Sequence, residues 1–223
     1  VGVGWYSGSC MHCHQCMSGS HHLCPQVQAT IVGHRGGFAT HIRLHWAWAI
    51  PLPEKLDFAE AGPLLCGGIT VFSPLMMHAK PTDRVGIIGI GGLGHMAVKF
   101  AAAYGCDVTA FTSSESKFDE AKGFGANRVV SSKDSAAISK LGGNFDLLIS
   151  TVNVKLDWDA MIGTLAPKGR LHVVGAVVEP IPVAAFPLIL KQRTVSGSPT
   201  GSPVAIATML DFASRHKIAP QTE

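Results

Sequence analysis

Residues 84–94 read Arg-Val-Gly-Ile-Ile-Gly-Ile-Gly-Gly-Leu-Gly, an apolar run that passes directly into a glycine-rich turn. The turn has the spacing Gly89-x-Gly91-x-x-Gly94 and opens a segment with the composition of a helix. In such a unit the first glycine permits a tight turn, the second lets the backbone approach a pyrophosphate, and the third packs the helix against the sheet. The helix N-terminus then faces the phosphates. The stretch predicts a dinucleotide site formed by Gly89, Ile90, Gly91, Gly92, Leu93 and Gly94.

Strands and helices alternate through the rest of the chain. We expect strands at 84–89, 107–111, 128–130, 145–150, 170–175 and 194–197, and helices at 92–104, 116–124, 135–141, 158–165 and 204–216. Continuous apolar strands that alternate with amphipathic helices are typical of a parallel sheet covered on both faces. The predicted fold class is therefore α/β, a Rossmann doubly wound parallel sheet.

The residues before this sheet have a different character. Residues 1–52 lack long helical periodicity and include a strand-like run, Thr40–Ala49. Helical stretches at Glu54–Cys66 and Thr70–His78 follow, separated by Gly67-Gly68. Each contains a proline, so kinks or shortened helices are expected.

Composition limits the possible partners. Charged residues make up 15% of the chain, the formal net charge is +3, and no basic block is present, so no nucleic-acid partner is expected. The most apolar region, 85–105, is interrupted by glycines, His95 and Lys99, and this argues against a membrane span. No secretory leader is visible, and we expect a cytoplasmic protein.

Four cysteines near the start of the chain have metal-ligand spacing. Cys10, Cys13, Cys16 and Cys24 form a C-x2-C-x2-C-x7-C pattern. Four thiolates can close a tetrahedral shell around one zinc ion that holds a loop in shape. An iron–sulfur half-site is the alternative, because a Cys-Pro pair ends the pattern. The long final gap and the missing second cluster motif favour zinc.

The end of the second expected strand indicates which dinucleotide binds. An NAD site places a carboxylate there to accept the ribose hydroxyls. This chain instead has Thr112, Ser113 and Ser114, followed by Lys117. Hydroxyls and a cation suit the 2′-phosphate of NADP. The hydroxyls could also simply cap the next helix, and Glu115 is a nearby acid, but the pattern favours NADP.

Several motifs together resemble the zinc-dependent medium-chain alcohol dehydrogenases. They are the cysteine pattern, Gly36-Gly37-Phe38-Ala39, the stretch Ala61–Thr70 and the turn Gly89–His95. The likeness is greatest to the NADP-dependent cinnamyl-alcohol-dehydrogenase-like branch and, within it, to bacterial broad-range aldehyde reductases. It implies a partial, β-rich GroES-like catalytic domain with a structural zinc lobe at residues 1–52, and an NADP-binding Rossmann domain at 53–223.

The resemblance also implies roles for single residues. Cys66 corresponds to the last protein ligand of a catalytic zinc, whereas without the family it would be a small buried apolar residue. Thr70 corresponds to a residue that packs against the nicotinamide. Thr151, Gly175 and Ser198 correspond to contacts with the ribose and the carboxamide. The implied reaction passes a hydride between NADPH and an aldehyde or primary alcohol, in a homodimer paired through the edge strand 193–198.

The chain also departs from the family pattern. The family's segment with the first catalytic cysteine, a proton-relay hydroxyl and a Gly-His-Glu motif is not found, nor are the strands that follow the last helix. We therefore expect a fragment that lacks part of the catalytic machinery. The alternatives to an aldehyde reductase are a non-catalytic NADPH-binding module and an iron–sulfur electron carrier.

Overall fold

The structure is a computed structural model that describes residues 1–34 and 36–222. Contacts between residues divide the chain into two compact units. The first unit is formed by Val1–Ser73 with Pro199–Glu223, and the second by Pro74–Ser198. The domain boundary between residues 52 and 53 remains a prediction from the family resemblance.

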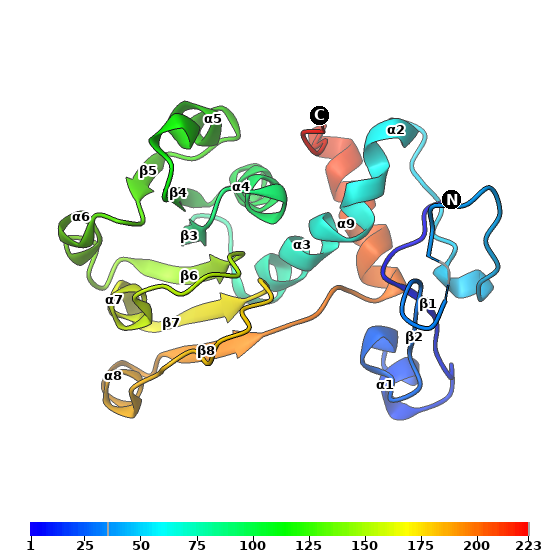
Figure 1. Ribbon diagram of the computed structural model, residues 1–223, viewed down its shortest axis with the longest axis horizontal. Coiled ribbons are helices and arrows are strands. Elements are labelled where there is room, and N and C mark those ends of the chain that lie inside the picture. Colours follow the sequence, from blue (N-terminus) through cyan, green and yellow to red (C-terminus); the bar gives the residue numbers. More distant parts are fainter. Residues whose placement is uncertain (35, 223) are drawn as a thin grey trace. The chain divides into compact units, whose positions relative to one another are not determined.

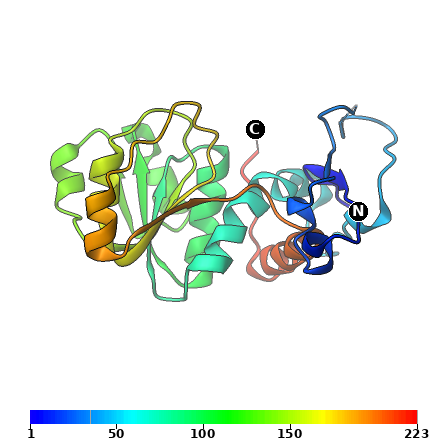
Figure 2. The same ribbon diagram turned by 90° about the horizontal axis from the view of Figure 1, so that it is seen from below.

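The second unit is built on a six-stranded sheet in which every neighbouring pair is parallel, in the order β5-β4-β3-β6-β7-β8. Its strands are β3 Arg84–Ile88, β4 Asp107–Thr112, β5 Arg128–Ser131, β6 Phe145–Ser150, β7 Leu165–Val173 and β8 Thr194–Gly197. Its α-helices are α4 Gly92–Tyr104, α5 Phe118–Gly123, α6 Ser135–Ser139, α7 Trp158–Gly163 and α8 Ala185–Lys191, and η4 Glu115–Lys117 is a short 3-10 turn. Helices cover both faces of the sheet (Figures 1 and 2).

The strand order places a ligand crevice at the centre of this sheet. The chain runs outward from β3 through β4 to β5, then returns to the other side of β3 to form β6, β7 and β8. The loops that leave β3 and β6 therefore turn in opposite directions at neighbouring carboxyl ends. In open parallel sheets a ligand binds at this switch point. The α/β fold predicted from the sequence is confirmed.

The turn between β3 and α4 is fixed by close contacts. Gly89 has φ +92°, a left-handed conformation that glycine adopts without steric cost. A Cβ atom on Gly94 would lie 1.7 Å from the carbonyl oxygen of Gly89. Only glycine fits at position 94, because any side chain would force the helix away from the strand.

Burial of large apolar side chains stabilises this unit. The core cluster combines Phe111 and Phe145 from the sheet with Trp158 and Met161 from α7, all at most 2% exposed. The rings of Phe111 and Phe145 meet edge to face at 5.6 Å. Fully burying each such side chain contributes roughly 1.5–3 kcal/mol, so the strands are held by packing as well as by their ladders.

The first unit has little regular structure at its start. Its elements are β1 Tyr6–Gly8, α1 His14–Met17, η1 His21–Leu23, β2 Gln28–Ala29, η2 Trp46–Trp48, α2 Phe58–Ala61, η3 Gly62–Leu65 and α9 Pro203–His216. The helix α3 Gly67–His78 begins in this unit and ends in the second. Strands β1 and β2 form a small antiparallel pair.

The prediction of a strand at Thr40–Ala49 is wrong. The structure has irregular backbone there, followed by the 3-10 turn η2. A strand needs a hydrogen-bonded neighbour along its length. In this stretch a single backbone hydrogen bond reaches a strand, from the His45 amide to the Ser7 carbonyl. Alternating polarity alone therefore did not produce a strand.

The helices differ from expectation at several ends. The stretch Glu54–Cys66 is helical only from Phe58 and tightens into a 3-10 turn at Gly62, where Pro63 follows. The break falls at Cys66, because Gly67 and Gly68 belong to α3. Helix α7 ends at Gly163, so Leu165, expected as a helix end, begins β7.

Helix α8 was not expected from the sequence. Its apolar run contains Pro187, which obscures the helical pattern although a first-turn proline is tolerated. Leu188 packs against the core, but two other apolar side chains of this helix point outward: Phe186 is 69% exposed and Ile189 70%.

Among the described residues, no single helix has the length and hydropathy needed to cross a membrane. Two consecutive helical segments, Phe58–Leu65 and Gly67–His78, reach that length and hydropathy only when they are taken together, and the chain bends by 57° between them.

The contact between β3 and α4 gives a direct test. We expect Gly94→Ala to lower the free energy of unfolding by roughly 1–3 kcal/mol, because the new methyl group overlaps the Gly89 carbonyl. Gly92→Ala is the matched control, since a Cβ there meets nothing within 4 Å. Thermal unfolding of both variants checks this, and equal melting temperatures would show that the contact is not restrictive.

Candidate functional site

A cavity of about 880 Å³ opens at the switch point of the sheet. We call it the nucleotide cavity. The cavity is lined from the end of β3 onward by Ile88–Leu93, and from the end of β4 onward by Phe111–Ser114 and Lys117. Ser132 and Lys133 after β5 and Thr151–Asp157 after β6 complete the lining. Four loops that are distant in sequence thus meet at the carboxyl ends of neighbouring parallel strands. Of the predicted cofactor residues, the cavity brings together Gly89 to Leu93, Thr112, Ser113, Ser114, Lys117 and Thr151.

The glycine turn leaves room for a ligand on its open side. A Cβ atom on Gly91 or on Gly92 would meet nothing within 4 Å, so both residues border open space. Gly91 is the N-cap of α4 and has no side chain to satisfy the first amides of the helix. Those amides are the groups that bind a pyrophosphate. The turn fits the diphosphate of a dinucleotide. Gly94, by contrast, acts in packing and is not among the cavity-lining residues.

The loop after β4 supplies hydroxyls and a cation. The Thr112 hydroxyl accepts a hydrogen bond from the Ser114 amide at 3.3 Å and so shapes the loop. Ser113 is exposed in the cavity, and Ser114 Oγ lies 2.7 Å from Ser116 Oγ. The Lys117 ammonium donates a hydrogen bond of 2.8 Å to the carbonyl of Ile90. The lysine thereby joins this loop to the glycine turn.

Thr151 ties the two central strands together on the other side of the cavity. Its hydroxyl lies 3.0 Å from the carbonyl oxygens of both Ile88 and Gly89, and its amide donates to Ile88. Gly175 packs beneath this loop, because a Cβ there would lie 2.1 Å from the carbonyl of Val152. Gly175 therefore permits a close approach of backbones and is not among the residues that line the nucleotide cavity.

Ser198 belongs to a polar group around the buried His172 that was not predicted from the sequence. The His172 ring is 1% exposed and lies between two hydroxyls, with Nδ1 2.9 Å from Ser196 Oγ and Nε2 2.8 Å from Ser198 Oγ. Burial, with further effects from His78 and Arg170, lowers the pKa of His172 to about 4. The ring is therefore neutral near pH 7 and acts as one donor and one acceptor. Contact of Ser198 with a nicotinamide stays a prediction.

Two further lysines border the nucleotide cavity and were not predicted. Lys133 follows β5 and Lys155 follows β6. Asp157 is the acid among the lining residues, and its carboxylate already accepts the Ala160 amide that begins α7. With Lys117, the cavity lining carries three ammonium groups, which favours a polyanionic ligand. Sequence position alone gave no signal for this, because the three loops meet only in the fold.

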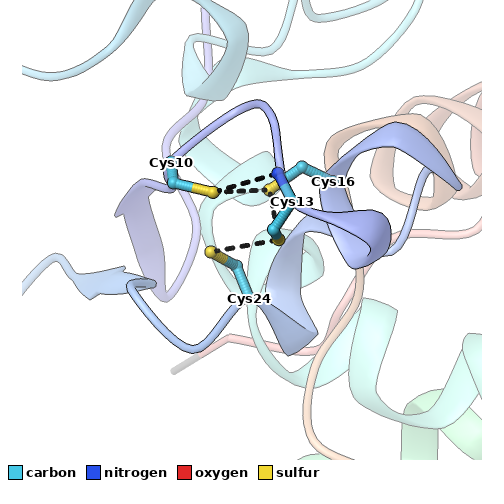
Figure 3. A group of neighbouring side chains, drawn as sticks. All are labelled: Cys10, Cys13, Cys16 and Cys24. Carbon is cyan, nitrogen blue, oxygen red and sulfur yellow. Dashed lines mark hydrogen bonds between the residues drawn. The ribbon is translucent and has the colours of Figure 1, made fainter.

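The four cysteines of the first unit converge (Figure 3). Their sulfur atoms all lie within 4.8 Å of one another, with separations of 3.9 Å for Cys10–Cys16, 3.6 Å for Cys13–Cys16 and 3.8 Å for Cys13–Cys24. Four sulfurs held at roughly 2.3 Å from one tetrahedral ion lie about 3.8 Å apart. The spacing thus fits a single zinc ion. A cluster of several irons would hold the sulfurs further apart.

The surroundings of these thiols also suit a metal ion. Backbone amides point at two of the sulfurs, from Cys13 to Cys10 and from Gln26 to Cys24, each at 3.3 Å. The backbone hydrogen bond from His12 lowers the pKa of Cys10 to about 6. A backbone hydrogen bond from Cys16 acts to lower the pKa of Cys13, but burial and the adjacent thiols outweigh it and raise that pKa to about 11. Crowded thiolates oppose one another's ionisation, and a divalent cation removes this opposition.

Cys66 and Thr70 lie in the first unit. Cys66 is exposed at the end of η3, and burial of part of its side chain raises the pKa of the thiol. The Thr70 hydroxyl donates to the Cys66 carbonyl at 2.7 Å. Among the described residues, the four-cysteine lobe is the one group of three or more candidate metal ligands, so no catalytic zinc set forms around Cys66.

Comparison with known families agrees with this geometry. Residues 92–215, more than half of the chain, match the family model described as zinc-binding dehydrogenase. The chain belongs to this family. Residues 1–54 match the alcohol dehydrogenase GroES-like domain. The resemblance inferred from the motifs is confirmed, and so is the combination of a Rossmann sheet with a GroES-like segment.

Individual relatives are similar over the whole chain. Aldehyde reductase AdhA from Synechocystis sp. is 55% identical over 224 residues, which is 100% of this chain and 67% of the relative. The structure of a cinnamyl alcohol dehydrogenase from Sorghum bicolor has a TM-score of 0.91 and 35% identity, over 99% of this chain and 66% of that one. A cinnamyl alcohol dehydrogenase from Helicobacter pylori, complexed with NADP(H), gives 0.89 and 30%, over 99% and 66%. The chain thus spans about two thirds of the length of each of these relatives.

The cysteine lobe predicts the metal content of the protein. We expect about one zinc ion per chain by elemental analysis, and we expect Cys24→Ser to lose it, because three thiolates leave the tetrahedral shell open. Cys66→Ser is the control and should keep the metal. Iron with a brown colour would instead identify a cluster, and zinc content unchanged by Cys24→Ser would place the metal elsewhere.

Proposed function

We propose that this zinc-binding dehydrogenase acts as an aldehyde reductase that uses NADPH. The reaction converts an aldehyde, NADPH and a proton into a primary alcohol and NADP⁺, and it runs in reverse with the alcohol. The observation that carries the proposal is the nucleotide cavity, which combines the glycine turn with Ser113, Ser114 and Lys117. The 55% identity to an aldehyde reductase supports the substrate class.

Bound NADPH supplies the hydride. The residues of the chain bind and orient it. The amides at the start of α4 bind the pyrophosphate, and Thr151 holds the two loops that border the cofactor at a fixed separation through its contacts with Ile88 and Gly89. Gly175 and Ser198 are proposed to lie along the nicotinamide ribose and the carboxamide, and Thr70 against the nicotinamide ring.

Preference for NADPH follows from the charges at the end of β4. Ser113 and Ser114 take the place where a carboxylate would bind the ribose hydroxyls of NAD, and Lys117 lies in the same cavity. Glu115 is exposed and is not among the residues that line the nucleotide cavity. Inside the nucleotide cavity a 2′-phosphate therefore meets hydroxyls and ammonium groups, whereas Glu115 lines a neighbouring hollow that Ser113 also borders.

Two roles are proposed for zinc. The four-cysteine lobe holds a structural ion, which stabilises a segment that has few strands of its own. Cys66 is proposed as one ligand of a catalytic zinc. The described residues do not supply the three protein ligands that such a site needs, and Cys66 alone does not hold the ion. A non-catalytic NADPH-binding module is therefore the second candidate, and cofactor binding without aldehyde turnover would favour it.

We propose that the protein forms a homodimer and that it is cytoplasmic. Strand β8 is one of the two edge strands of the sheet. Helix α8, which precedes it in the chain, exposes apolar side chains: Phe186 is 69% exposed, Ile189 70% and Leu190 63%. An unpaired edge beside apolar side chains favours pairing with a second copy. Six free cysteines, four of them in a metal lobe, favour a reducing compartment such as the cytoplasm.

The cofactor preference can be tested by adding one charge at Ser113. We expect the wild-type protein to bind NADPH more tightly than NADH, and Ser113→Asp to weaken NADPH binding by roughly 10- to 100-fold, because a carboxylate repels the 2′-phosphate. Ser113→Asn has nearly the same shape without the charge and should change affinity only a few-fold. Calorimetric titration measures both cofactors. Tighter binding of NADH than of NADPH would refute the proposed cofactor preference. The reaction itself is tested by measuring aldehyde-dependent oxidation of NADPH with the protein purified from its natural host.

Dimer formation makes a separate prediction. Sedimentation should give twice the chain mass at micromolar concentration, and Ile189→Glu should shift the protein toward monomer by placing a charge on the proposed interface. Val204→Glu is the control, because Val204 is 62% exposed on α9 in the first unit. A monomeric wild-type protein, or equal effects of the two substitutions, would contradict the proposed interface.

A further inference from the structure

Lys133 occupies a position that the strand pairing determines. Strands β4 and β5 are parallel, with Thr112 opposite Ser131, so the residues that follow them leave the same edge of the sheet side by side. The Ser132 amide donates to the Thr112 carbonyl at 2.9 Å and extends this pairing by one residue. Lys133 therefore emerges beside Ser113, although the two are twenty positions apart in the sequence.

Lys133 and Ser113 share two adjacent hollows. Both line the nucleotide cavity. Both also line a second, more open hollow of about 630 Å³, which we call the adjoining hollow and which is lined by Ser113, Glu115, Ser131, Lys133, Asp134 and Ser135. Ser113 thus lies at the border of the two, with Lys133 on the β5 side. A group bound to the Ser113 hydroxyl is within the space that the Lys133 side chain borders.

The backbone that carries Lys133 is fixed. Its amide donates to the Ser131 hydroxyl at 3.3 Å, and the next amide, of Asp134, donates to the Ser131 carbonyl at 3.2 Å. The Asp134 carboxylate is engaged in capping α6, where it accepts the Ala137 amide at 2.9 Å. None of the ion pairs found between described side chains includes Lys133. The backbone of Lys133 is therefore held in place, while its ammonium group forms no ion pair with an acid among the described side chains.

Lys117 leaves room for a second cation. In the structure its ammonium is bound to the carbonyl of Ile90, on the glycine-turn side of the cavity. A 2′-phosphate bound at Ser113 carries close to two negative charges, more than one ammonium neutralises. Lys133 is the lysine that borders Ser113 from the loop after β5. Two acids line the adjoining hollow: Asp134 is engaged in capping α6, and Glu115 competes for the Lys133 ammonium.

We propose that Lys133 is a second specificity-determining cation for the 2′-phosphate of NADPH, acting from β5 while Lys117 acts from β4. The proposal rests on the proposed function, because it assumes that NADPH is the ligand of the nucleotide cavity. It assigns Lys133 to the phosphate that distinguishes NADPH from NADH, and it gives the residue no part in binding the groups that the two cofactors share.

The test compares ligands that differ only in the 2′-phosphate. Dissociation constants for NADPH, NADH, adenosine 2′,5′-bisphosphate and 5′-AMP are measured by calorimetry on the full chain, for the wild type and for Lys133→Gln. We expect Lys133→Gln to weaken NADPH and the bisphosphate roughly tenfold, the loss of one charge-assisted hydrogen bond, while NADH and 5′-AMP change less than about twofold. Lys133→Arg should restore binding, since it keeps the charge.

Lys140→Gln is the matched control, because Lys140 is an exposed lysine at the far end of α6 and lines neither hollow. Equal behaviour of the Lys133 and Lys140 variants, with wild-type preference for NADPH intact, would overturn the role of Lys133 and leave the proposed function standing. Equal loss of NADPH and NADH in Lys133→Gln would also overturn it. A wild-type protein that binds neither cofactor would instead overturn the proposed function.

Discussion

The close approach of α4 to β3 is the constraint on which the nucleotide cavity depends. Helix α4 can begin directly after the strand only because Gly94 has no side chain to strike the Gly89 carbonyl. That approach aims the first amides of the helix into the cavity, where Gly91 and Gly92 leave open space. The strand order then brings the loops after β4, β5 and β6 to the same edge. The close contact between Gly94 and the Gly89 carbonyl therefore fixes the position of the cavity in which the lysines and hydroxyl groups meet.

The first unit is organised by a different principle. Its start has two short strands, Tyr6–Gly8 and Gln28–Ala29, and short helical turns, so it buries few apolar side chains for its length. The four sulfurs instead lie at the mutual distances that one tetrahedral ion requires. Coordination bonds in such a lobe contribute folding free energy that a small apolar core cannot supply. The four cysteines lie within 15 consecutive residues, in and around α1 and η1.

Local chemistry could be predicted from the sequence, and chemistry that depends on pairing between distant segments could not. The glycine turn and the cysteine pattern each lie within 15 consecutive residues, and both sets converge as expected. The strand at Thr40–Ala49 failed because a strand depends on a neighbour that the alternation of polarity does not reveal. Lys133 and the buried His172 were missed for the same reason, since each meets its partners across paired strands. Helix α8 was missed because Pro187 masks its periodicity.

The bond between Lys117 and the Ile90 carbonyl has a consequence for recognition. A lysine side chain that is free in solution loses roughly 1.5–2 kcal/mol of rotamer entropy when it is immobilised. Here the ammonium is already held against the glycine turn before any ligand arrives, so much of that ordering has occurred during folding. An incoming anion then meets a receptor that is rigid in advance, and discrimination between charged and uncharged riboses depends on electrostatics more than on rearrangement of the loop.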